Sequence, residues 1–169
     1  ALAEAAGDEG DPVLILALGG LSSGASTEGD FATAFAIGER EIRLLKDSAG
    51  PPFFLGMALL AQGGVAIELG EYAAARAYLE ESLAIAHEAG DGFRIAHAIN
   101  SLGDLARCEQ RYAEARIAYE QSAGLLRELA AHLGMGRVDK LRAAFRLRQA
   151  HVGRPLGEAC HPALAFAPD

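Results

Sequence analysis

The sequence predicts an all-α fold, a solenoid of antiparallel helix pairs. The chain matches itself when it is shifted by 40 residues, with nine identities between residues 63–88 and 103–128 in one register. Apolar residues in each repeat recur at three- and four-residue spacing, which places them on one face of a helix. The connections within each of the two clearest repeats are two to four residues long, and such short connections make the paired helices antiparallel.

The first repeat, residues 12–50, is the most degenerate. Its first helix is expected from Pro12 to about Ala25, because proline suits the first helical turn. Residues 26–30 are expected to form a loop that leads into the second helix. With an offset of 41 residues, the places of Tyr72, Ala75 and Leu83 are taken in this helix by Phe31, Ala34 and Ile42. Pro51 and Pro52 separate this repeat from the next, because neither continues a preceding helix.

The second and third repeats, residues 53–90 and 93–133, each read as two amphipathic helices joined by a turn, at residues 69–71 and 110–111. Gly63 and Gly103 fall within helices, where glycine costs about 1 kcal/mol relative to alanine. This cost predicts close helix approach at both glycines, with Ala75 and Ala115 as the partner positions.

After the third repeat, a single helix over residues 135–152 is expected to cap the stack, and residues 161–169 to form a loose tail. Residues 1–160 are thus expected to make one domain. The first residues, ALAEAAGD, resemble residues 83–91, LAIAHEAGD, which close a later repeat. The sequence is therefore expected to be a fragment that begins partway through a helix.

The repeated residues resemble the tetratricopeptide repeat (TPR) family. Leu102-Gly103 is followed by Tyr112, Ala115 and a small residue at 122, and the segment from Leu60 to Tyr72 fits the same pattern. The 40-residue length is similar to that of repeats in kinesin light chains and in the C-terminal regions of large bacterial signal-transducing ATPases and transcriptional regulators. The segment 72–91 looks closest to the bacterial group. The resemblance implies a right-handed superhelix and a non-enzymatic scaffold that binds a protein or peptide partner.

In TPR solenoids the first helix of each pair lines a concave groove, and this resemblance selects the candidate binding residues. Asn100 resembles the asparagine with which longer TPRs hold a peptide backbone, since an amide both donates and accepts hydrogen bonds. Arg137 and Lys140 are candidates for pairing with an acidic side chain or a carboxyl terminus. The alternative is that Asn100 caps or bridges neighbouring helices and that the basic residues are solvated. The remaining candidates in the groove are His97, Ser101, Asp104, Arg107, Met57, Leu60 and Ile67.

No catalytic, metal or cofactor site is predicted. No histidine pair has the spacing of a helical zinc site, and the glycines at 19, 20 and 24 lack the lysine of a phosphate-binding loop. Glu80 and Glu120 follow Arg76 and Arg116 by four residues, which predicts solvated ion pairs on the helix surface. Two cysteines form no disulfide framework, and two reduced thiols in a cytoplasmic protein are expected.

The net charge of −8 argues against a direct nucleic-acid partner, and no apolar run approaches the length of a membrane span. Charge is uneven, because residues 137–154 hold six Arg or Lys and one Asp, a net +5, which leaves −13 elsewhere.

Two other functions stay open. One is a self-associating segment that forms a homodimer through exposed terminal repeats, at Ala1–Ala6, Val13 and Leu14. The other is a small-molecule sensor lined by Met57, Leu60 and Ile67.

Overall fold

A computed structural model describes residues 11–48 and 50–132, and these residues form six α-helices. The bounds are α1 Pro12–Glu28, α2 Phe31–Asp47, α3 Pro52–Leu69, α4 Tyr72–Glu88, α5 Gly92–Cys108 and α6 Tyr112–His132. The first helices of the pairs begin at residues 12, 52 and 92, and the second helices at 31, 72 and 112. The 40-residue period of the sequence is thus also the period of the structure, and the predicted all-α solenoid is confirmed.

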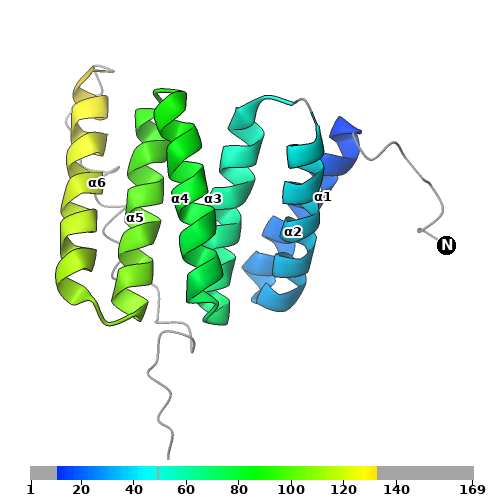
Figure 1. Ribbon diagram of the computed structural model, residues 1–169, viewed down its shortest axis with the longest axis horizontal. Coiled ribbons are helices and arrows are strands. Elements are labelled where there is room, and N and C mark those ends of the chain that lie inside the picture. The colour runs from blue at the N-terminus through cyan, green and yellow to red at the C-terminus, as the bar shows by residue number, and fades with distance from the viewer. Residues whose placement is uncertain (1–10, 49, 133–169) are drawn as a thin grey trace, which may run out of the picture.

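The helices stack side by side in chain order, with α1 at one end and α6 at the other (Figure 1). Each helix packs against the next one along the chain. In addition, α1 contacts α3 and α3 contacts α5. The first helices of successive repeats therefore lie next to each other and form a common side of the stack, which is the side where the resemblance places a groove.

Local signals in the sequence set the helix ends. Asp11, Asp30 and Asp91 cap α1, α2 and α5 by accepting hydrogen bonds from backbone N–H groups two or three residues later. Gly29 and Gly70 end α1 and α3 in the left-handed region, with φ of 84° and 78°. The helix α1 extends to Glu28, so the loop expected at 26–30 is only Gly29 and Asp30. The side chain of Thr27 donates to the carbonyl of Ser23 and keeps its donor satisfied within the helix.

Gly63 and Gly103 allow the close packing of helices that the sequence predicts. The side chains nearest to these glycines are not those of the predicted Ala75 and Ala115. A Cβ on Gly63 would lie 2.6 Å from the side chain of Leu79, and one on Gly103 would lie 2.7 Å from Tyr119. Leu79 and Tyr119 are one 40-residue period apart, so both repeats use the same contact. Ala75 contributes its carbonyl oxygen, 3.5 Å from the Gly63 position, rather than its side chain.

Buried hydroxyl groups tie the two helices of a repeat together. Ser82 donates to the carbonyl oxygen of Gly56 at 2.8 Å, and Ser122 donates to that of Ala96 at 2.7 Å. Both serines are 1% exposed, so each hydrogen bond satisfies a donor that has no access to water. These two positions repeat in the sequence because the packing requires a short donor there.

Two further observations concern the composition of α3 and the state of Cys108. Among the described helices, α3 is long and apolar enough to cross a membrane, although no single apolar run in the sequence shows it. A helix buried in a protein core has the same composition, and α3 packs against α2, α4 and α5. Cys108 is buried and disulfide-bonded, which contradicts the expectation of two reduced thiols.

Candidate peptide-binding groove

The ten predicted groove residues lie on α3, on α5 and outside the described residues. Ile67 is 5% exposed, and the partly buried Leu60 packs against the same core cluster, so both side chains contact neighbouring helices. Met57 is 49% exposed and lines a cavity. Arg137 and Lys140 lie outside the described residues.

The candidates on α5 are partly buried, and three of them, His97, Asp104 and Arg107, have contacts within the third repeat. His97 packs its ring 4.5 Å from the ring of Phe93, and burial lowers the pKa of this histidine. Asp104 accepts a hydrogen bond from the Tyr119 hydroxyl at 2.9 Å and lies 3.6 Å from the Arg107 guanidinium. Burial, together with the charge of Asp104, raises the pKa of Tyr119 to about 12, so this phenol stays protonated. Asp104 is therefore bound within its own repeat.

The groove that the structure shows lies elsewhere, between the first two repeats. A cavity of about 700 Å³ is bounded by α1, α2 and α3, and its walls are mainly apolar. Three of its lining residues are large apolar side chains about half or more exposed: Leu16 at 74%, Phe54 at 50% and Met57 at 49%. Because these walls are open to solvent, the cavity is a surface groove and not a closed chamber.

A second, smaller cavity of about 220 Å³ continues from the first along α1 and α3. Its lining is rich in small polar residues, including Ser22, Ser26 and Thr27 from α1. The two cavities share five lining residues, which are Gly19, Ser23, Glu41, Ala58 and Ala61. They therefore form one groove with an apolar end and a polar end, which we call the α1–α3 groove.

Small side chains explain why the groove exists. Gly19, Gly20 and Ser23 on α1 stand across from Ala58 and Ala61 on α3, so the two helices cannot fill the space between them. The glycine and serine run of α1, which resembles a phosphate loop only superficially, is helical throughout. Its role in the fold is to leave this space open.

Glu41 lies where the two cavities meet. A Cβ on Gly19 would lie 2.6 Å from the Glu41 Oε1 atom, so the carboxylate approaches the backbone of α1 directly. Within the described residues it has neither a hydrogen bond nor an ion pair, and burial raises its pKa. Two bases of α2 are engaged elsewhere, since Arg43 pairs with Glu39 and Lys46 with Glu81.

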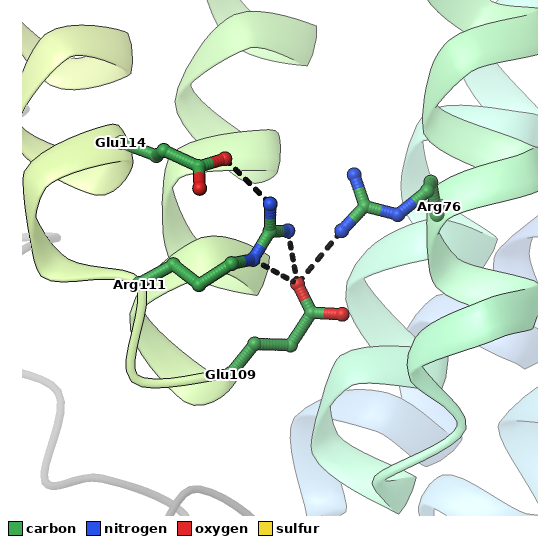
Figure 2. Close-up of polar contacts among 4 residues, drawn as sticks. All are labelled: Arg76, Glu109, Arg111 and Glu114. Atoms are coloured by element: carbon green, nitrogen blue, oxygen red, sulfur yellow. Dashed lines mark hydrogen bonds and ion pairs between the residues drawn. The ribbon is translucent and has the colours of Figure 1, made fainter.

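A second charged cluster, at the junction of the second and third repeats, is structural (Figure 2). Glu109 accepts hydrogen bonds from Arg76 of α4 at 2.7 Å and from Arg111, whose guanidinium also reaches Glu114 at 2.5 Å. Two acids and two bases balance each other here. Arg76 thus pairs with Glu109 of the next repeat and not, as the sequence predicts, with Glu80. The other predicted pair, Arg116 with Glu120, is present at 3.0 Å.

We expect the variant E109Q to lower the free energy of unfolding by about 1 kcal/mol at neutral pH, the value for a partly exposed ion pair. Burial would raise the pKa of Glu109, but hydrogen bonds from Arg111 and Arg76 outweigh it and lower this pKa below 4.5. The carboxylate therefore contributes stability above pH 4.5, and the contribution is lost as pH falls through the lowered value. In urea unfolding, the native protein and E109Q should therefore have the same free energy of unfolding in acid. A difference independent of pH would contradict this account.

The comparison with known families agrees with the architecture. Residues 54–128 match the model of the tetratricopeptide repeat family, and this part of the chain is a tetratricopeptide repeat region. A search of curated proteins finds no match to the chain. Repeats of this family generally mediate protein–protein interaction and are typically non-enzymatic. Residues 11–48 and 50–132 contain no group of three or more metal-ligating side chains placed to hold a metal ion.

Proposed function

We propose that this protein is a non-enzymatic interaction module that binds a protein segment in the α1–α3 groove. The observation that supports this function best is the apolar wall of the groove, where Leu16, Phe54 and Met57 are exposed to solvent beside a cavity of about 700 Å³. A contiguous exposed apolar surface that is also concave is typical of a recognition site. The resemblance of residues 72–91 to bacterial regulators favours a role as one part of a larger regulatory or signalling protein.

The test is selection of binding peptides from a display library of short random peptides, using the whole chain as bait. We expect the selected peptides to bind the native protein and to lose at least tenfold in affinity for Ala61→Trp. Ala61 is exposed and lines both cavities, so tryptophan there fills the groove without entering the core. Ala84→Trp, at an exposed position of α4, is the matched control and should bind normally. Equal loss in both variants, or no binding peptides at all, would refute the function.

Self-association is the second candidate, and one observation favours it. Val13, Leu16 and Leu21 of the terminal helix α1 are 72%, 74% and 60% exposed, and the end of a repeat stack is an apolar surface that a second copy can cover. Sedimentation over a range of concentrations separates the two. A monomer at all concentrations removes this candidate, whereas a dimer that Val13→Lys dissociates would establish it.

A further inference from the structure

We infer that the α1–α3 groove is selective for a partner segment that places one lysine or arginine, flanked by apolar residues, on the carboxylate of Glu41. This inference rests on the proposed function, because it specifies the partner of the same groove. The carboxylate lies at the junction of the apolar and polar cavities, and no described residue pairs with it. Among the described residues that line the two cavities, the ionisable ones are Glu41 and Glu68, both acids, and Glu41 supplies a negative charge where the cavities meet.

The repeat shows that Glu41 does not make the helix-to-helix hydrogen bond of its aligned positions. With the 41-residue offset between α2 and α4, Glu41 occupies the position of Ser82, and Ser122 stands one period further on. Both serines donate to a carbonyl oxygen of the first helix of their repeat. An ionised carboxylate cannot donate. Glu41 therefore leaves out the bond that the other two repeats make, and it directs a charge into the groove instead.

The chemistry of the groove then determines the partner. An apolar segment alone would cover Leu16, Phe54 and Met57 but would also remove water from the Glu41 carboxylate without replacing its hydrogen bonds, which is unfavourable. An acidic segment would add repulsion. A lysine or arginine extends a charged group beyond an apolar stem, so one such side chain covers the wall with its stem and pairs with Glu41 through its head.

The N-terminal residues of the chain do not fit this description. Residues 1–10 contain three acids, Glu4, Asp8 and Glu9, and no base. The basic segment 137–154, by contrast, has the required charge. A second copy could therefore occupy the groove through this segment. That result would overturn the proposal of a separate partner.

The experiment is a double-mutant cycle on a peptide selected as described above. Its lysine or arginine is replaced by norleucine, which keeps the stem and removes the charge, and both peptides are titrated against the native chain and Glu41→Gln. We expect norleucine to weaken binding to the native chain about tenfold and binding to the glutamine variant less than about twofold. Asp47→Asn removes the same charge from an exposed position of α2 and should behave as the native chain does.

Three outcomes would overturn the inference while leaving the proposed function intact. The selected peptides could lack lysine and arginine, or the norleucine effect could be the same for native chain and Glu41→Gln while Ala61→Trp still abolishes binding. The native chain could also form a dimer that Glu41→Gln dissociates and that a synthetic peptide of residues 137–154 competes away. Thermal unfolding of Glu41→Gln controls for folding, and it should show no loss of stability because no described residue pairs with the Glu41 charge.

Discussion

Replacing Leu79 by alanine is expected to lower the free energy of unfolding by about 2–5 kcal/mol, the range for a fully buried leucine. Leu79 is 0% exposed and belongs to the core cluster that joins the second and third repeats through Ala66, Leu105 and Cys108. It also covers Gly63, where a Cβ would lie 2.6 Å from its side chain. The neighbouring helices cannot close the cavity without moving a whole repeat, so relaxation recovers little of the loss.

Urea unfolding of the full chain measures this effect. Leu21→Ala makes the same chemical change at a residue that is 60% exposed, and we expect it to alter stability by no more than about 0.5 kcal/mol. If Leu79→Ala cost no more than Leu21→Ala, the assignment of Leu79 to the core between repeats would be wrong.

The second large effect is expected at Arg94, an arginine that is only 7% exposed. Its Nε atom donates to Asp91 at 2.8 Å, one terminal nitrogen donates to the carbonyl of Phe53 at 2.8 Å, and its guanidinium lies 4.1 Å from the centre of the Phe53 ring. These contacts attach the start of α5 to the start of α3, one repeat earlier. Hydrogen bonds of a charged group contribute about 1.5–3 kcal/mol, and we expect Arg94→Met to lose about that much.

Methionine keeps much of the apolar stem, so the loss reports mainly on the charge and its hydrogen bonds. The cap of α5 should survive, because Asp91 also accepts a hydrogen bond from the backbone N–H of Arg94 at 3.0 Å, and this bond is the largest cause of the lowered pKa of Asp91. Arg127→Met, at an exposed position of α6, is the control. Equal midpoints for both variants in thermal unfolding would show that Arg94 does not join the repeats.

Sequence reasoning located the architecture well because the repeated positions are packing positions. Two pairs of residues recur at the 40-residue period because each member contacts a neighbouring helix: Gly63 with Gly103, and Ser82 with Ser122. The spacing of such contacts determines the period. The least accurate boundary was the end of α1, where serine and threonine suggested a loop but Gly29 ends the helix. Apolar stripes were less informative on α3, whose residues are apolar around most of its circumference, so Ile67 could not be told from Met57 by spacing alone.

The binding groove was harder to predict because it depends on what is missing. Gly19 stands where the next repeats have Leu59 and Ile99, and an absent side chain gives no pattern. Glu41 did leave a signal, since an acid stands where the aligned repeats have Ser82 and Ser122. Only the assembled helices, however, show that the Glu41 position opens into a cavity.

Amide hydrogen exchange on the complex with a selected peptide tests the central claim, that the partner is held between α1 and α3, most directly. The account predicts added protection in α1 and in the first half of α3, the helices that supply Leu16, Gly19, Met57 and Ala61 to the groove, with little change in α6. Protection confined to α5 and α6, around His97 and Asn100, would contradict the claim and would place the binding site in the third repeat.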